Sequence, residues 1–304
     1  MRILVTGASG QLGRDVADVL IGALPMGAEH GTGRRWRPAA GAAGMEVMAV
    51  DHRSLDVSQR DRVAAAFEGF RPDAVVHCAA WTAVDACESD PERAFVVNAM
   101  GTRHIAEAAR RHRTHVVYVS TDYVFDGTAD RPYVEWDPPN PLSVYGRSKR
   151  GGELELDGGD TIVRTSWVCG YHGANMVRTV LRLAAGGQPM RFVDDQRGSP
   201  SFTADLAAGL ALLSTERLPG VFHLTNQGAT TWFEFAQAVM SASGQDPQQV
   251  SPITTAELQP PRPAPRPANS VLDNTAWRAL GMSPLPPWQE SLDRLVSAIA
   301  AGGS

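Results

Sequence analysis

The sequence predicts an α/β protein with a doubly wound parallel sheet and a smaller C-terminal lobe. Short, nearly continuous apolar runs alternate with helical patterns from the N-terminus to about residue 166. This alternation is typical of strands buried on both faces of a parallel sheet. The glycine-rich stretch GASGQLG separates the first apolar run from the first helical pattern, and in that position it is typical of a nucleotide-binding turn.

The first part of the chain supplies five strands and the helices between them. The expected strands are residues 2–6, 45–51, 73–80, 115–120 and 161–166. The first expected helix follows GASGQLG and runs through Val16, Val19 and Leu20. Further helices are expected at 58–70 and 90–112 and in the stretch NPLSVYGRSKRGGE at 140–153. Ser58 and Asp90 are suitable N-caps, and Pro91 suits a first helical position. Residues 22–45 are rich in Gly, Ala and Pro without a period, so we expect an inserted loop there.

Three glycines mark the turn after the first strand. Gly7, Gly10 and Gly13 lie where the strand gives way to a helix. A helix N-terminus offers free N–H groups and the positive end of the helix dipole, which suits a pyrophosphate. Glycines let the backbone approach the phosphates closely. The fold class is therefore Rossmann-like, with a dinucleotide as the expected ligand.

Past residue 166 the alternation of strands and helices loosens. A strand at 221–226, a helix at 230–243, a proline-rich loop at 260–267 and a final helix at 286–301 are expected there. We expect residues 1–165 to form the dinucleotide-binding domain. Residues 166–304 then form mainly a substrate-binding lobe, with segments of about 190–226 returning to the sheet.

Asp51 and Arg53 follow the second strand and bear on the choice of cofactor. An acid at this point can accept hydrogen bonds from the adenosine ribose, which favours NADH. A basic side chain beside it favours the 2′-phosphate of NADPH. The alternative reading of Asp51 is an ordinary turn aspartate, so the cofactor preference stays open.

Tyr145 and Lys149 stand four residues apart, which places both on one face of a helix. Such a pair is often an ordinary surface pair. Here, however, the stretch STDYVFDG leaves the fourth strand at its C-terminal end, where open α/β sheets bind ligands, and it offers Thr121. A nearby ammonium favours phenolate and lowers the pKa of a tyrosine. We therefore expect Lys149 to tune Tyr145 for acid–base chemistry.

Composition excludes several classes of protein. The net charge of −5 argues against a general affinity for nucleic acid. Three cysteines, with no C-x-x-C pair, argue against a disulfide framework and favour a reducing compartment. No apolar stretch approaches the length of a membrane span, and the first one is too short for a signal-peptide core. We expect a cytoplasmic protein that binds neither nucleic acid nor membranes.

The motifs together resemble the extended short-chain dehydrogenase/reductase superfamily. The chain is most similar to the dTDP-4-dehydrorhamnose reductases, over almost its whole length apart from residues 22–45. The stretches that carry the similarity are AAWTAVDACES (79–89), VNAMGT (97–102), STDYVFDG (120–127), NPLSVYGRSK (140–149), RTSWV (164–168), DDQRGSP (194–200) and RPANS (266–270).

The resemblance implies NAD(P)H-dependent reduction of the C4 keto group of a dTDP-4-dehydro-6-deoxyhexose. The simplest case is dTDP-4-dehydro-β-L-rhamnose to dTDP-β-L-rhamnose, a step of deoxysugar biosynthesis for a polysaccharide or an antibiotic. It implies Thr121, Tyr145 and Lys149 as the catalytic trio. The residues implied for the cofactor, beside this pair and the glycine turn, are Gln11, Leu12, Asp51, Asp56, Val57, Ala80, Trp81, Thr82 and Val119.

The resemblance also implies contacts with the dTDP-sugar. Thr121, Asp122 and Trp167 are implied for the sugar nucleotide, and Asn175 and Arg266 for its diphosphate. A core tryptophan and a helix cap are the alternative readings of Trp167 and Asn175.

Some members of the family bind Mg²⁺ through glutamates at a homodimer contact. Asp15 can stand for one of these glutamates, whereas the positions near Ala204 and Ala298 are not acidic. The sequence therefore supports Mg²⁺ and this homodimer only weakly.

Two alternative functions remain. One is another nucleotide-sugar epimerase or dehydratase of the superfamily; dehydratases carry an Asp-Glu pair after the threonine, whereas Thr121 is followed by Asp122 and Tyr123. The other is a non-catalytic, NADP-binding regulatory subunit. A broken catalytic trio would indicate that role, and here the trio is intact.

Overall fold

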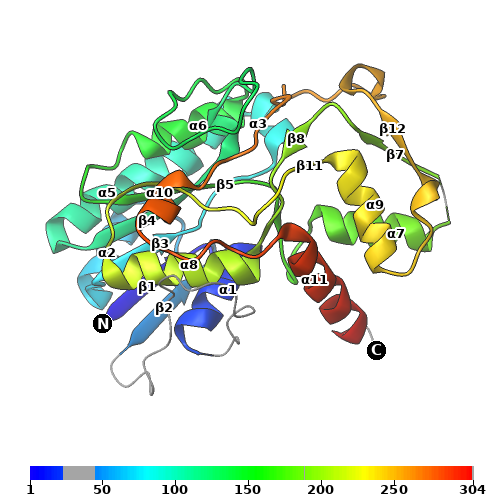
Figure 1. Cartoon of the computed structure of the whole chain (residues 1–304). Helices are drawn as coiled ribbons and strands as arrows, with labels where there is room; N and C mark the ends of the chain where they lie inside the picture. The colour runs from blue at the N-terminus through cyan, green and yellow to red at the C-terminus, as the bar shows by residue number, and fades with distance from the viewer. Residues whose placement is uncertain (23–44, 188, 303–304) are drawn as a thin grey trace.

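The structure is a computed structural model that describes residues 1–22, 45–187 and 189–302. Apart from Gly22 and Met45, the predicted inserted loop at 22–45 lies outside these residues. The described part of the chain has an α/β fold built around a six-stranded sheet and a second, smaller lobe (Figure 1).

The central sheet is parallel throughout and doubly wound, as predicted. Its strands are β1 (Arg2–Thr6), β2 (Glu46–Val50), β3 (Ala74–His77), β4 (His115–Thr121), β5 (Thr161–Thr165) and β10 (Gly220–His223). Their order is β10-β5-β4-β3-β1-β2, and every neighbouring pair is parallel. The chain runs outward from β1 to β2 and then reverses through β3. Ligands bind outside the carboxyl ends of the strands at such a reversal.

Helices cover both faces of the sheet (Figure 1). One face carries α1 (Gln11–Leu20) and α8 (Thr203–Glu216), and the other carries α2 (Arg60–Phe70), α5 (Gly101–His112) and α6 (Val144–Glu153). Successive side chains of a strand point to opposite faces. Accordingly, Ile3 and Val5 of β1 belong to the core under α1 and α8, whereas Leu4 belongs to the core under α2 and α5.

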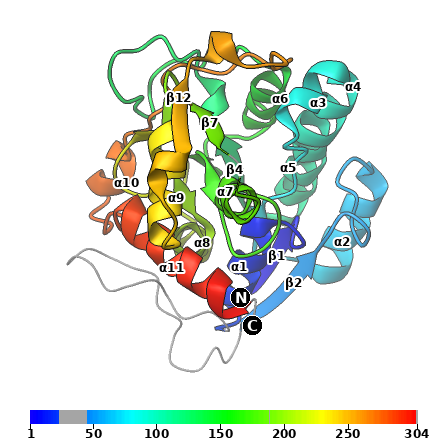
Figure 2. The same ribbon diagram turned by 90° about the vertical axis from the view of Figure 1, so that its right-hand side faces the viewer.

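The second lobe has its own hydrophobic core. It contains α7 (Met176–Ala185), α9 (Trp232–Ala242) and α11 (Trp288–Gly302) beside the parallel pair β7 (Met190–Val193) and β12 (Val250–Ile253) (Figure 2). Phe235 of α9 and Trp288 of α11 are buried in this core, with ring centroids 5.6 Å apart.

Short elements complete the described chain. They are α3 (Val84–Ser89), α4 (Pro91–Phe95), the π-helical turn η1 (Val96–Met100), η2 (Asp122–Val124), β6 (Val168–Cys169), β8 (Arg197–Gly198), β9 (Ser201–Phe202), β11 (Thr230–Thr231), η3 (Pro247–Gln249), η4 (Thr255–Glu257) and α10 (Thr275–Ala279). No described helix has the length and apolar character needed to cross a membrane.

Of the two predicted helix N-caps, one is confirmed and the other is wrong. Asp90 accepts a hydrogen bond from the Arg93 backbone N–H at 3.0 Å, which confirms it as an N-cap. The predicted Ser58 cap is wrong, because α2 begins at Arg60 and the Ser58 hydroxyl donates to Asp56 at 2.7 Å instead. Helix α8 was not predicted, since it is buried on most of its surface and so lacks an amphipathic period.

Gly152 marks a close approach of α6 to its surroundings. A Cβ at this position would lie 2.7 Å from the Asn98 carbonyl oxygen and closer still to Tyr118 Oη. We predict that Gly152→Ala lowers the free energy of unfolding by about 1–3 kcal/mol, because α6 must shift to relieve the overlap. Urea denaturation measures this change.

Gly69 of α2 provides the matched control. A Cβ there would meet nothing within 4 Å, and alanine is the better helix former. Gly69→Ala should therefore leave the free energy of unfolding unchanged or raise it by up to about 1 kcal/mol. Two variants of equal stability would contradict the tight packing at Gly152.

Candidate active site

A cleft of about 580 Å³ lies at the carboxyl ends of the parallel strands. Residues that follow β1, β3, β4 and β5 line it, and Trp232 of α9 contributes from the second lobe. Its lining includes most of the residues that the sequence assigned to a site: Gly7, Gly10, Gln11, Leu12, Gly13, Asp56, Val57, Ala80, Trp81, Thr82, Val119, Thr121, Asp122, Tyr145, Lys149 and Trp167. Five assigned residues lie outside the lining, namely Asp15, Asp51, Arg53, Asn175 and Arg266.

The glycine turn has the shape that a pyrophosphate requires. Gly7 has a φ of +70°, and a Cβ on it would lie 2.7 Å from the Ala79 nitrogen after β3. Gly10 is the N-cap of α1 and offers no side chain to its first turn, which also lacks acidic residues. The N–H groups of that turn are therefore available to an anion.

Asp51 stabilises its own turn. Its Oδ1 accepts hydrogen bonds from the Ser54 hydroxyl at 2.7 Å and from the Ser54 N–H at 2.9 Å, and these bonds hold the pKa of Asp51 below its usual value. His52 and Leu55 line the cleft at this end, whereas Arg53 is exposed. The sequence motifs do not mark His52 and Leu55, although both lie within a few residues of the acid at the end of the second strand.

Tyr145 lies at the start of α6, inside the cleft. Ser143 caps this helix, because its Oγ accepts a hydrogen bond from the Gly146 N–H at 3.0 Å. Burial raises the pKa of Tyr145 well above its usual value, and a hydrogen bond with Thr121 only partly offsets this effect. The expectation that Lys149 lowers this pKa is therefore wrong for the protein alone. The phenol remains protonated at neutral pH, which is the form that a proton donor needs.

Lys149 lies one turn further along α6 and is 2% exposed. Its Nζ donates to the Val119 carbonyl at 2.7 Å and lies 4.0 Å from the centroid of the Tyr118 ring. Burial lowers the pKa of Lys149 to about 7, and the charge of Glu153 acts in the opposite direction.

Lys149 is also the only lysine in the sequence, although lysine and arginine together number 28. Arginine stays charged at any physiological pH, whereas a buried lysine can lose its proton. A single lysine that is also buried in the cleft is a signal in the composition that the sequence analysis missed.

Glu153 joins α6 to the sheet. Its carboxylate accepts two hydrogen bonds of 2.9 Å from Arg164 of β5 and one of 2.6 Å from the Ser120 hydroxyl of β4. Glu153, Arg164 and Ser120 are all at most 3% exposed. Burial works to raise the pKa of Glu153, but the bonds and charge of Arg164 outweigh it, so the pKa is lowered and the carboxylate stays ionised.

Thr121 and Asp122 lie where β4 ends. The Thr121 hydroxyl donates to Asp122 Oδ1 at 3.0 Å and accepts from the Tyr123 N–H at 3.2 Å. Asp122 is 2% exposed, and burial raises its pKa to about 7. This carboxyl group therefore titrates near neutral pH.

Two stacked tryptophans form another part of the wall. The rings of Trp167 and Trp232 lie 3.5 Å apart between centroids and 7° from parallel. Trp167 has a φ of +46°, and a side chain on Gly198 would collide with its indole ring. Trp232 lines the cleft although the sequence analysis did not assign it.

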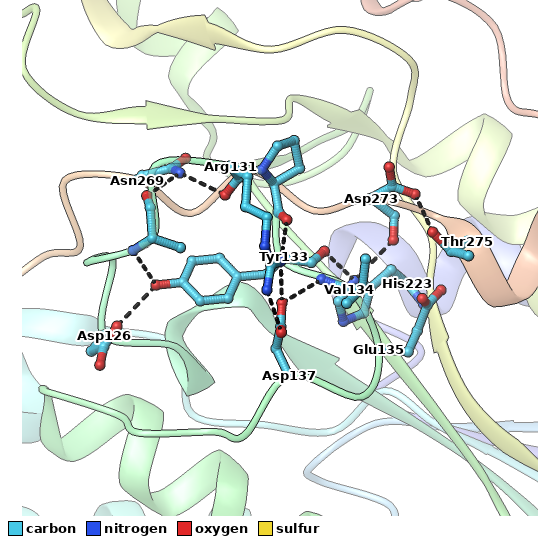
Figure 3. Close-up of polar contacts among 12 residues, drawn as sticks. Asp126, Arg131, Tyr133, Val134, Glu135, Asp137, His223, Asn269, Asp273 and Thr275 are labelled. Atoms are coloured by element: carbon cyan, nitrogen blue, oxygen red, sulfur yellow. Dashed lines mark hydrogen bonds and ion pairs between the residues drawn. The ribbon is translucent and has the colours of Figure 1, made fainter.

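Hydrogen bonds join the segment after η2 to residues in the second half of the chain (Figure 3). The Tyr133 hydroxyl donates to Asp126 at 2.9 Å, and the backbone of Tyr133 pairs with Val271 and Asp273. Arg131 binds Asp137 through two bonds of 2.7 and 2.8 Å. These contacts fix the chain that leaves the carboxyl end of β4.

The two residues predicted for a diphosphate contact other protein groups. Asn175 caps α7 by accepting from the Arg178 N–H at 3.1 Å, and its Nδ2 donates to Gln11 at 2.9 Å. Arg266 binds the Asp85 carboxylate through two bonds of 2.9 and 2.8 Å. Both side chains therefore already have protein partners, and neither residue lines the cleft.

Asp15, the weak metal candidate, lies buried on α1 with a hydrogen bond to Thr203, and burial raises its pKa. Within residues 1–22, 45–187 and 189–302, no group of three or more His, Cys, Asp or Glu side chains is arranged to hold a metal. No step below depends on a metal.

Comparison with known proteins identifies the family. The family model described as the RmlD substrate binding domain matches residues 21–301. The chain is 42% identical to the dTDP-4-dehydrorhamnose reductase of Streptomyces griseus, over 98% of this chain and 94% of that one. The chain belongs to the dTDP-4-dehydrorhamnose reductase family. The resemblance drawn from the motifs is thereby confirmed.

Two further relatives have names that state a substrate or a bound cofactor. A dTDP-4-keto-6-deoxy-D-glucose reductase of Streptomyces niveus is 36% identical, over 100% of this chain and 99% of that one. The crystal structure of the Bacillus anthracis dTDP-4-dehydrorhamnose reductase in complex with NADP superimposes with a TM-score of 0.86. It is 34% identical, and the match covers 98% of this chain and 99% of that one.

The protonation of Lys149 can be measured directly, because lysine-selective ¹³C labelling gives one lysine signal. We predict a midpoint near pH 7 for the protein alone, instead of the usual value of about 10.4. Glu153→Gln should move the midpoint lower still, because it removes the negative charge that favours the ammonium. A wild-type midpoint near 10 would contradict the burial of this ammonium.

Proposed function

We propose that this protein catalyses the NAD(P)H-dependent reduction of the C4 keto group of a dTDP-4-dehydro-6-deoxyhexose. The simplest substrate is dTDP-4-dehydro-β-L-rhamnose, with dTDP-β-L-rhamnose as product. The observation that carries the proposal is that one cleft brings Thr121, Tyr145 and Lys149 together with the glycine turn. Family membership supports the substrate class, because both named relatives are reductases of dTDP-4-keto sugars.

The cleft offers a path for a dinucleotide from the glycine turn to the catalytic trio. The first turn of α1 would hold the pyrophosphate, and Val119 and residues 79–82 line the stretch towards Tyr145. When bound, the nicotinamide supplies a hydride to C4. Every other step of the proposal belongs to side chains of this chain.

Tyr145 is proposed as the proton donor. As C4 is reduced, its oxygen becomes an alkoxide, and a protonated phenol beside it can complete the alcohol. Thr121 donates a hydrogen bond to the same oxygen in place of its bond to Asp122. A donor already in position stabilises charge that develops in the transition state more than it stabilises the substrate.

Lys149 is proposed to hold the nicotinamide ribose and to keep Tyr145 active. In the protein alone its Nζ binds the Val119 carbonyl, at the edge of the cleft. A bound dinucleotide brings negative phosphate charge, which favours the ammonium. The full positive charge would then be present during turnover, when phenolate must be stabilised after proton transfer.

For the cofactor we propose tolerance of both NADH and NADPH. Asp51 lies outside the cleft lining, next to the lining residue His52, and its carboxylate is already bound by Ser54 of its own turn. The exposed Arg53 and the lining His52 can approach a 2′-phosphate. These groups favour different cofactors, and the NADP complex of a relative supports NADPH as one of the two.

The cellular setting is part of the same proposal. All three cysteines are free thiols, which supports a reducing compartment and therefore the cytoplasm. A homodimer is the proposed assembly, supported by the exposed apolar side chains of Phe95, Val96 and Met100 along α4 and η1.

The test is cofactor oxidation followed at 340 nm with a panel of dTDP-4-keto-6-deoxy sugars, each with NADPH and NADH. We expect turnover with both cofactors and the highest kcat/KM for the 4-dehydro-L-rhamnose substrate. Stoichiometric cofactor consumption would also exclude an epimerase or dehydratase, since these regenerate their cofactor. Absence of oxidation with every sugar, despite cofactor binding, would favour the regulatory subunit.

Tyr145→Phe tests the proton donor within this assay. It removes one hydroxyl and little volume, so kcat should fall by about 10²–10⁴-fold while the Kd for NADPH and the Tm stay close to wild type. Tyr171→Phe, outside the cleft lining, is the control and should retain full activity. Near wild-type kcat in Tyr145→Phe would refute the mechanism.

A further inference from the structure

Two buried polar atoms in the cleft have no hydrogen-bond partner among the described residues. They are Asp122 Oδ2 and Thr165 Oγ1. Asp122 is 2% exposed and Thr165 is 4% exposed. Leaving such an atom unpaired is costly, and most buried polar groups in native proteins are paired.

Their place in the cleft distinguishes them from similar atoms elsewhere. Three other buried side-chain atoms of the described chain also lack a partner, on Glu135, His223 and Ser283, and none of these residues lines the cleft. Asp122 and Thr165 both line it. The missing partner of Thr165 can therefore be a ligand, whereas the Asp122 carboxyl also interacts with the Ser270 side chain, which lowers its pKa.

Sheet register places Thr165 beside Thr121. The two residues are partners at the ends of the parallel strands β5 and β4, so their side chains share one face of the sheet on strands about 4.8 Å apart. Asp122 is next in the chain, and its Oδ1 already accepts the Thr121 hydroxyl at 3.0 Å. Both unpaired atoms thus lie close to the hydroxyl that is proposed to bind the C4 oxygen.

The chemistry of the sugar identifies which group would meet them. In a 6-deoxyhexose, C4 has two ring neighbours. One is C5, which carries the methyl group, and the other is C3, which carries a hydroxyl. The 3-hydroxyl is therefore the hydrogen-bonding substituent nearest to the reacting oxygen. A hydroxyl both donates and accepts, so it can pair with a threonine hydroxyl and a carboxyl oxygen together.

We propose that Thr165, together with Asp122, binds the 3-hydroxyl of the sugar, so that the cleft selects 3-hydroxylated 4-keto sugars over 3-deoxy sugars. This inference rests on the proposed function, because it takes Thr121 as the residue that marks the C4 oxygen. Thr165 was assigned by neither the motifs nor the resemblance. Its role is to set specificity by direct contact with the substrate.

The experiment compares two substrates and four variants. The substrates are a dTDP-4-keto-6-deoxyhexose and its 3-deoxy analogue. Thr165→Val removes the hydroxyl at constant shape, and Thr165→Ser keeps it. Asp122→Asn alters the second partner. Thr161→Val, at the opposite end of β5 and outside the cleft lining, is the matched control for a buried threonine.

We expect wild type to prefer the 3-hydroxylated sugar by about tenfold or more in kcat/KM, as one or two hydrogen bonds provide. Thr165→Val should lose about tenfold with this sugar and little with the 3-deoxy analogue, so the preference disappears. Asp122→Asn should reduce the preference in the same way. Thr165→Ser and Thr161→Val should keep it, and the Kd for NADPH should not change in any variant.

Three results would overturn the inference. They are equal losses with both sugars, an unchanged preference in Thr165→Val, and a loss that follows the 2-hydroxyl when a 2-deoxy sugar is tested. In each of these cases wild type still reduces 4-keto sugars, so the proposed function stands. A wild-type protein that reduces no 4-keto sugar would instead overturn the proposed function, and this inference with it.

Discussion

The buried ion pair between Glu153 and Arg164 determines the geometry of the cleft. It joins the last turn of α6 to β5, and the Ser120 hydroxyl joins the same carboxylate to β4. Tyr145 and Lys149 lie two turns and one turn earlier on that helix, so their positions relative to the strand ends depend on it. Such a pair need not add net stability, because desolvating two charges is costly. Its effect here is to fix where α6 lies.

Burial determines the chemical state of the groups that α6 and β4 bring together. It raises the pKa values of Tyr145 and Asp122 and lowers that of Lys149. All three shifts favour the neutral form, as expected for groups buried away from solvent. Without a ligand, the Tyr145 phenol is therefore protonated. The negative charge of a bound dinucleotide would favour the protonated ammonium form of Lys149 beside it.

Local patterns in the sequence were sufficient for the sheet and the glycine turn, and the structure brings Thr121, Tyr145 and Lys149 into one cleft. Local patterns were insufficient where tertiary contacts decide. Asn175 and Arg266 fit a diphosphate by resemblance, yet in the fold they bind Gln11 and Asp85. Thr165 has no motif of its own, and only sheet register places it beside Thr121. Burial determines the pKa of Tyr145, and the spacing of a tyrosine and a lysine in the sequence does not show how buried they are.

The central claim is that this cleft delivers a hydride to C4 of a dTDP-4-keto sugar and consumes the cofactor. The most direct measurement is turnover of such a sugar with NADPH deuterated at C4 of the nicotinamide on the transferred face, followed by NMR of the product. The account predicts one deuterium at C4 of the sugar for each NADPH oxidised. Deuterium retained on the cofactor, or incorporated at any other sugar carbon, would contradict it.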